Sequence, residues 1–106
     1  MAFILKDLLP ELAQELKELL MAEKESDLAM QVSSLQIVDR CRCGDDFCAT
    51  IYAESKPKGC YGPGHQCIEL EPKHGMLILD VVNNKIAAVE ILYRDEIRKA
   101  LLTALP

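Results

Sequence analysis

Two apolar, β-branched runs meet at a two-residue turn, and this arrangement constrains the fold more than any other feature of the chain. The first run ends at Val82 and the second begins at Lys85, with Asn83 and Asn84 between them. Asparagine tolerates positive φ, and a two-residue connection of this kind favours a type I′ turn. We therefore predict a β-hairpin over Met76–Tyr93.

Both faces of this predicted hairpin are apolar. If Val82 opposes Lys85 and that register continues, one face carries Leu77, Leu79, Val81, Ile86, Ala88 and Leu92. The other face carries Met76, Ile78, Val89, Ile91 and Tyr93. A sheet face left in water would alternate with polar residues. We therefore expect the hairpin to be central in its sheet and covered on both sides.

Helical periodicity marks the two ends of the chain. Apolar residues recur at three- and four-residue spacing over Leu5–Lys24, with Asp7 as a plausible N-cap and Pro10 in the first turn. The leucine spacing suits packing within the domain, and it also suits a short helix-mediated dimer. A second short helix is predicted over Ser26–Val32 and a final one over Asp95–Leu105.

The middle of the chain predicts further strands. Leu35–Cys43 and Phe47–Ala53 form a candidate pair around the turn Gly44–Asp46, and Cys67–Glu71 is a further short strand. The segment Glu54–Gln66 is rich in proline and glycine, which indicates a long loop.

The order of these elements predicts a single α+β domain over residues 1–106, with a helical part at 5–33, a sheet at 35–93 and a C-terminal helix at 95–105. We expect an antiparallel sheet of about four to five strands in a meander. The amphipathic helices at the two ends are the natural covers for the hairpin. They could lie one on each face, or both on one face with a partner on the other.

Charge and composition exclude several function classes. Half of the 106 residues are apolar, 27% are charged, and the formal net charge is −5. An acidic chain with scattered basic residues is not expected to bind nucleic acid or an anionic membrane. No apolar run approaches the ~20 residues that span a bilayer. We expect a cytoplasmic protein with reduced thiols.

A cysteine-rich segment over residues 41–67 is the one candidate for site chemistry. Zinc takes a tetrahedral set of thiolates and imidazoles, usually supplied as two close pairs. The candidate ligands are Cys41, Cys43, Cys48, Cys60, Cys67 and His65. Their spacing departs from standard zinc pairs, so three interpretations stay open: buried structural thiols, a metal site, and redox or regulatory chemistry.

The register of the strands around this segment separates these interpretations. If Cys43 opposes Phe47, the apolar faces match, and Cys48 falls on the other face beside Arg40 and Arg42. If Cys43 opposes Cys48, the thiols converge. Burying each large side chain contributes ~1.5–3 kcal/mol, so we expect the first register and structural thiols, with Cys48 the best candidate for a lowered pKa. Sulfur atoms within about 4 Å of one another would instead favour zinc.

Two other polar residues deserve a prediction. Glu90 lies opposite Leu77 on an apolar face, so it is either a buried carboxylate with a raised pKa or a partner of Lys or Arg near a sheet end. We expect the ion pair. His65 is either a ligand or base, or an exposed loop histidine, and no motif marks an Asp or Ser partner for it. We expect an exposed loop histidine.

Three stretches of the chain resemble a family of small uncharacterised bacterial proteins. They are Arg40–Thr50 with its C-x-C-G-D-D-x-C-x-T motif, the Y-G-P-G-H run Tyr61–His65, and Gly75–Leu92. The resemblance covers roughly the C-terminal two-thirds of the chain. It implies a bacterial cytosolic protein, and it assigns no chemistry to any residue.

Two functions from different classes follow. We expect a non-enzymatic module without a cofactor that binds a protein partner or itself, because no convergent polar set or catalytic motif is evident. The alternative is a zinc-binding or thiol redox site in residues 41–67. The sequence does not decide whether the chain is an enzyme, but it favours a protein without enzymatic activity.

Overall fold

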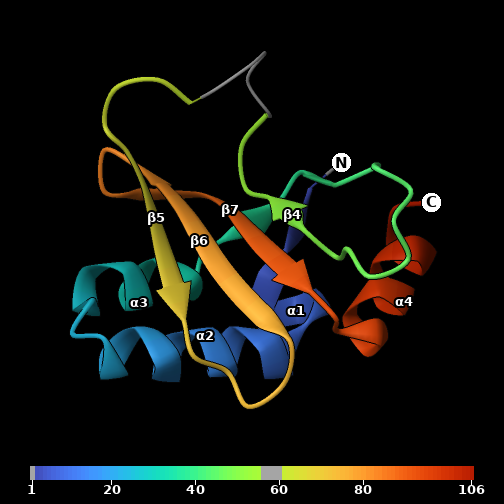
Figure 1. Cartoon of the computed structure of the whole chain (residues 1–106), viewed down its shortest axis with the longest axis horizontal. Coiled ribbons are helices and arrows are strands. Elements are labelled where there is room, and N and C mark those ends of the chain that lie inside the picture. The colour runs from blue at the N-terminus through green and yellow to red at the C-terminus, as the bar shows by residue number, and fades with distance from the viewer. Residues whose placement is uncertain (1, 56–60) are drawn as a thin grey trace.

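A computed structural model describes residues 2–55 and 61–106 of the chain, which form an α+β fold built on an antiparallel sheet (Figure 1). In chain order the elements are β1 (Phe3–Ile4), α1 (Leu5–Leu8), α2 (Pro10–Ala22), α3 (Ser26–Val32), β2 (Gln36–Ile37), β3 (Asp39–Arg40), β4 (Ile51–Tyr52), β5 (His65–Leu70), β6 (Met76–Val82), β7 (Lys85–Leu92) and α4 (Asp95–Ala104). The predicted fold class is confirmed.

The predicted N-terminal helix is divided into two. Leu9 has φ −132° and ψ 67°, which ends α1, and Pro10 then begins α2. A proline disfavours the helical conformation of the residue before it, which explains the break. Asp7 lies inside α1 and is not the predicted N-cap.

A brace between α3 and the hairpin turn fixes how the helices meet the sheet. The Nε2 atom of Gln31 donates to the carbonyl of Asn84 over 2.5 Å, and its Oε1 accepts from the amide of Ile86 over 3.0 Å. The two-residue strand β1, which was not predicted, pairs with β2 through Phe3 and Ile37.

The main sheet has five strands in the order β3-β4-β7-β6-β5. The predicted meander holds for β5, β6 and β7, whereas β4 pairs with β7. The predicted strands Leu35–Cys43 and Phe47–Ala53 shorten to two-residue ladders. Strand β5 begins at His65, inside the segment predicted as loop.

The hairpin is confirmed, and its predicted register holds next to the turn, where Val82 pairs with Lys85, but not beyond Val81. Asn83 and Asn84 have φ of 50° and 67°, as a type I′ turn requires. Val81 pairs with Ile86, whereas Asp80 pairs with Ala88, so a β-bulge leaves one extra residue in β7. A bulge shifts every later residue by one position.

This shift separates apolar from polar side chains. The face toward the helices carries Leu77, Leu79, Val81, Ile86, Val89 and Ile91, all buried in one core. Glu90 pairs with Ile78, not with Leu77, and it shares the opposite face with Asp80. The predicted assignment of Val89 and Ile91 to the second face is therefore wrong.

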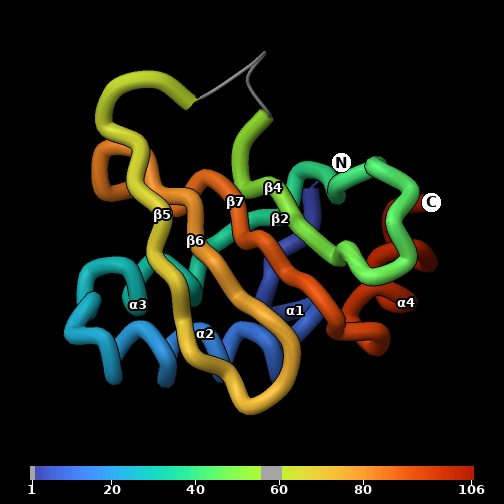
Figure 2. Tube along the Cα trace, viewed as in Figure 1, coloured from blue at the N-terminus to red at the C-terminus, as the bar shows by residue number. Residues whose placement is uncertain are grey.

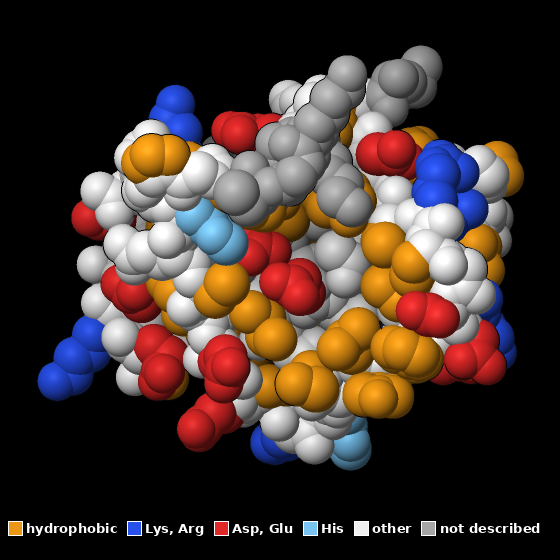
Figure 3. Space-filling view, turned by 45° about the horizontal axis from the view of Figure 1, so that its top comes forward, with side chains coloured by type: hydrophobic (Ala, Val, Ile, Leu, Met, Phe, Trp, Pro, Cys, Tyr) orange, Lys and Arg blue, Asp and Glu red, His pale blue; other side chains and the backbone are white. Residues whose placement is uncertain are grey.

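Helices cover one face of the sheet, not both. The traces of β5 and β6 pass in front of α2 in Figure 2, and α4 adds Ile97 and Leu101 to the same core. On the opposite face, which we call the open face, Met76 is 44% exposed. Figure 3 shows acidic side chains and a histidine on this side of the molecule. The predicted cover on both faces is absent from the described residues.

None of the helices in residues 2–55 and 61–106 combines the length and the hydropathy that a bilayer crossing requires.

Candidate metal centres

The strands that carry the first cysteines pair in the register that the sequence analysis disfavoured. Asp39 pairs with Tyr52 and Arg40 with Ile51. The amide of Cys41 continues this ladder by donating to the carbonyl of Thr50 over 2.8 Å. This register buries Ile51 in the core and places Cys41 on the open face.

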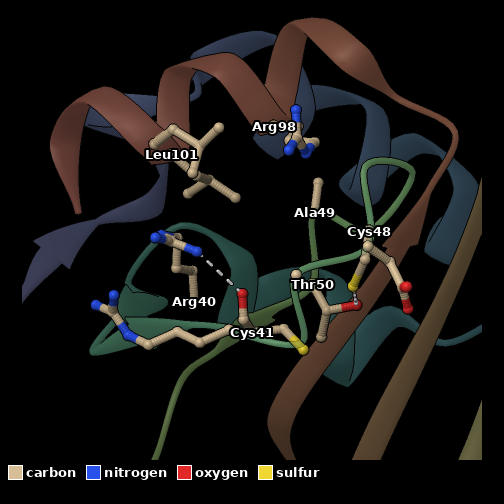
Figure 4. A pocket seen from close by; sticks show the side chains of 11 residues that line it. Arg40, Cys41, Cys48, Ala49, Thr50, Arg98 and Leu101 are labelled. Carbon is tan, nitrogen blue, oxygen red and sulfur yellow. Dashed lines mark hydrogen bonds between the residues drawn. The ribbon is translucent and has the colours of Figure 1, made fainter. Parts of the chain in front are cut away.

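Three cysteines converge at this end of the open face. The Sγ atoms of Cys41, Cys43 and Cys48 all lie within 4.8 Å of one another. Gly44, at φ 84°, reverses the chain between them, a conformation that glycine adopts without strain. In Figure 4 the side chains of Cys41 and Cys48 extend away from Leu101 of α4. We call this group the three-cysteine cluster.

The cluster is anchored at Cys48. Its Sγ donates to Thr50 Oγ1 over 3.5 Å, and its backbone forms a bridge with Leu92 at the end of β7. Thr50 Oγ1 in turn accepts from the amide of Ile91 over 3.2 Å. One of the three sulfur atoms is therefore held by the sheet, while Cys43 lies in the exposed connection.

Amide donors favour a thiolate in this cluster. Burial raises the pKa of Cys41. Hydrogen bonds from the Cys43 amide and from the Cys43, Tyr52 and Cys48 side chains outweigh that effect, so the pKa lies below its ordinary value. A hydrogen bond from the Asp45 amide lowers the pKa of Cys43. The hydrogen bond between the Cys43 and Cys41 side chains, some burial and the nearby Cys48 sulfur together raise that pKa to about 11. A single negative charge is thus stabilised, and further ionisation is opposed by like charge.

Arg40 and Arg42 do not serve Cys48 as predicted. Arg40 Nε donates to the carbonyl of Leu105 over 2.5 Å, and Arg42 binds Asp39 at 3.0 Å. Both arginines line a hollow of about 250 Å³ between the cluster and α4 (Figure 4). Arg42 Nη1 also donates to the carbonyl of Pro106 over 3.0 Å, so both arginines tie the cysteine loop to the C-terminal segment.

A second cluster lies on the same face, on β5 and β6. His65 Nε2 lies 2.9 Å from Asp80 Oδ1, and Cys67 Sγ donates to the same oxygen over 3.3 Å. The third distance, Cys67 Sγ to His65 Nε2, is 3.8 Å. Cys67 is the cross-strand partner of Asp80, and His65 shares its face two residues earlier. We call these residues the His-Cys-Asp cluster.

Further ionisable groups surround Asp80. Burial, a hydrogen bond to Asp80 and its negative charge raise the pKa of Glu90 to about 7, while His65 acts in the opposite direction. The ring of Tyr61 lies 4.7 Å from the ring of His65, centroid to centroid. Burial and the charges of Asp80 and Glu90 raise the pKa of Tyr61. The expected pairing of Glu90 with Lys or Arg is wrong, because its partner is a carboxyl group.

The structure divides the predicted ligand set into two groups and leaves one residue aside. Cys41, Cys43 and Cys48 form one group, and Cys67 and His65 belong to the other; Cys60 lies outside the described residues. None of the described cysteines is buried, so the prediction of core thiols is wrong. His65 is in a strand and hydrogen-bonded, so the prediction of an exposed loop histidine is also wrong.

Asp80 is the functional candidate that the sequence analysis missed. It is 6% exposed in the middle of a central strand. An aspartate between Leu79 and Val81 was itself the signal, because aspartate is depleted in strands and a buried carboxylate requires partners. Tyr52 was missed too, and only the register places its hydroxyl near Cys41.

One hollow of about 360 Å³ connects the surroundings of the two clusters; Cys41, Cys48, Tyr52, Asp80 and Glu90 are among the residues that line it. No protein-family model, curated protein or solved structure matches the chain. The resemblance to small bacterial proteins therefore stays a prediction, and the chemistry must be argued from the side chains.

Proposed function

We propose that this protein binds zinc, or a cation of similar preference, through Cys41, Cys43 and Cys48. The observation that supports the proposal is the convergence of their three Sγ atoms within 4.8 Å. Tetrahedral coordination with Zn–S bonds of ~2.3 Å needs sulfur atoms about 3.8 Å apart. The sulfur atoms therefore need to close by at most about 1 Å, and the exposed connection that carries Cys43 gives room for it.

The electrostatics of the cluster suit a cation. Metal ligation requires thiolates, and amide donors already stabilise one at Cys41. The remaining ionisations are opposed by neighbouring sulfur charge, which a divalent cation would neutralise. Three protein ligands leave a fourth position for water or for a group from a partner. Bound zinc would also fix the loop between Cys41 and Cys48.

Zinc-dependent protection of thiols tests the proposal. The metal-free full chain is treated with iodoacetamide with and without zinc, and the modification at each cysteine is measured by mass spectrometry. We expect zinc to slow the alkylation of Cys41, Cys43 and Cys48 by at least about tenfold, because the metal occupies the nucleophilic sulfur. Equal rates with and without zinc at these cysteines would refute the proposal.

Two serine substitutions give a matched control. Cys43→Ser and Cys67→Ser each change one exposed cysteine outside the core, so neither should prevent folding. Only C43S should abolish the protection of Cys41 and Cys48. Loss of that protection in C67S, with C43S unaffected, would assign zinc to a different ligand set.

A second candidate function is self-association through the open face, with or without zinc. Phe47 is 40% exposed and Tyr93 63% exposed, and their rings stack with centroids 5.3 Å apart. Met76 lies opposite Leu92, the residue before Tyr93. Figure 3 shows hydrophobic side chains gathered on this side of the molecule, and exposed apolar patches of this kind mark interfaces. Light scattering should give the mass of a dimer for the wild type and of a monomer for Tyr93→Lys. A strict monomer at all concentrations would remove this candidate.

The expected surroundings follow from the thiols and the charge. We place the protein in the bacterial cytoplasm, where reducing conditions keep cysteines available to a metal. A net charge of −5 disfavours nucleic acid as a partner. A protein partner, or a second copy of the chain, is consistent with the acidic and apolar open face.

A further inference from the structure

We propose that His65, Cys67 and Asp80 form a second site for a divalent cation of the zinc class, separate from the three-cysteine cluster. Imidazole nitrogen, thiolate sulfur and carboxylate oxygen are all zinc ligands. The three ligand atoms meet with separations of 2.9, 3.3 and 3.8 Å. Tetrahedral zinc with bond lengths of ~2.0–2.3 Å needs separations of about 3.3–3.8 Å. Small side-chain adjustments therefore suffice to admit the ion.

The backbone holds these ligands in place. His65 and Cys67 lie two residues apart on β5, so their side chains leave the same face of the sheet. Asp80 is directly opposite Cys67 on the neighbouring strand. Sites on paired strands are held more rigidly than sites on loops. The ring of Tyr61 lies against His65 and limits its rotation.

Negative charge around the site favours a cation. Asp80 is buried, and among the described residues its one ion-pair partner is His65, which is charged only when protonated. The hydrogen bond to Asp80, some burial and the charges of Asp80, Glu90 and Glu69 all raise the pKa of the Cys67 thiol. A divalent ion would neutralise these carboxylates and permit the thiolate to form.

Glu90 would act beyond the ligand shell. Its hydrogen bond to Asp80 orients that carboxylate, as groups behind metal ligands commonly do. Three protein ligands would leave a fourth position open, and of the three ligands Asp80 lines the hollow between the two clusters. A small anionic or neutral donor could reach the ion there.

Cobalt(II) tests the proposal in the absence of the first site. In the full chain carrying Cys41→Ser, Cys43→Ser and Cys48→Ser, and with Cys60 unchanged, we expect one cobalt equivalent and a sulfur-to-cobalt charge-transfer band. Adding Cys67→Ser should abolish the band and weaken cobalt affinity at least about tenfold. Adding Glu69→Gln is the matched control, because Glu69 lies on the same strand and face without being a ligand. It removes one nearby charge but no ligand, so the band should remain and the cobalt affinity should change far less than in C67S.

Two results would overturn the proposal. One is cobalt affinity in the three-serine protein no greater than after addition of C67S; the other is a band that survives C67S. If the three-serine protein does not fold, alkylation of the wild type decides. Zinc should then protect Cys67, and His65→Gln should remove that protection without changing the protection of Cys41. Unprotected Cys67 would refute the second site and leave the three-cysteine site standing.

Discussion

Nε2 of His65 lies 2.9 Å from the buried Oδ1 of Asp80. This contact joins the first residue of β5 to the centre of β6, on a face that the sequence predicted to be apolar and covered. It places ionisable side chains among the apolar residues of the open face, on the side of the sheet opposite the core.

The stability of the metal-free protein should depend on pH through Glu90. Its pKa rises from 4.5 in the unfolded chain to about 7, so the folded state holds a proton that the unfolded state releases in between. The free energy of unfolding should therefore fall as pH rises from 5 to 8. Urea denaturation with a chelator present measures this slope.

Glu90→Gln supplies the control for that slope. The amide keeps a hydrogen bond to Asp80 but cannot ionise, so this part of the pH dependence should disappear and the variant should gain stability relative to wild type above pH 7. His65 and Asp80 face Glu90 and remain in both proteins. An unchanged slope in E90Q would show that Glu90 does not titrate as described.

Replacing Gly75 should destabilise the protein far more than replacing Gly62. Both have positive φ, 67° and 82°, but a Cβ on Gly75 would lie 2.5 Å from the carbonyl oxygen of Leu92, whereas one on Gly62 would meet nothing. Gly62→Ala should cost about 1–2 kcal/mol from backbone strain alone. Gly75→Ala should cost a further ~1–3 kcal/mol from the displaced backbone. Thermal or urea unfolding measures both, and equal costs would contradict the predicted collision.

Adjacent apolar residues at the end of β7 should differ sharply in their contribution. Ile91 is fully buried toward the helices, whereas Leu92 lies on the open face. Ile91→Ala should cost ~2–5 kcal/mol because it leaves a cavity in the core. Leu92→Ala should cost at least about 1 kcal/mol less. The reverse order in urea denaturation would mean that the bulge is misplaced.

Arg94 should be the most important surface charge. Its guanidinium binds both carboxylate oxygens of Glu15, at 2.8 and 3.0 Å, and its side chain is 14% exposed. Arg94→Met should cost about 1.5–3 kcal/mol, because the hydrogen bonds are to a partly buried charged group. Lys99→Met removes an exposed pair with Asp95 and should change stability by less than about 0.5 kcal/mol. Denaturation at low salt compares the two.

Patterns that repeat over many residues were readable from the sequence. The Asn83-Asn84 turn, the hairpin around it and α4 each follow from periodicity or turn chemistry. The break before Pro10 was readable in principle, since the steric effect of proline on Leu9 is local. The two-residue strand β1 was not, because so short a segment has no period.

Registers decided the candidate sites, and a register depends on one residue. The burial argument for opposing Cys43 to Phe47 counted apolar side chains but assumed that the apolar faces of Leu35–Cys43 and Phe47–Ala53 pair directly. The structure buries Ile37, Ala49 and Ile51 in one core while Phe47 remains 40% exposed. Because Phe47 does not need to be buried, the strands can adopt the register in which Cys43 opposes Cys48, and this register brings the sulfur atoms together.

One alanine in β7, Ala87, has no partner in β6, and it sets the orientation of the residues that follow it. Positions 88–92 owe their orientation to Ala87, which itself belongs to neither cluster. Deleting Ala87 would shift the alternation of side chains along the strand by one residue, so Glu90 would point into the leucine-rich core and Ile91 would point toward water. Core packing and ligand geometry would then be lost together, because both depend on the orientation of the same stretch of β7.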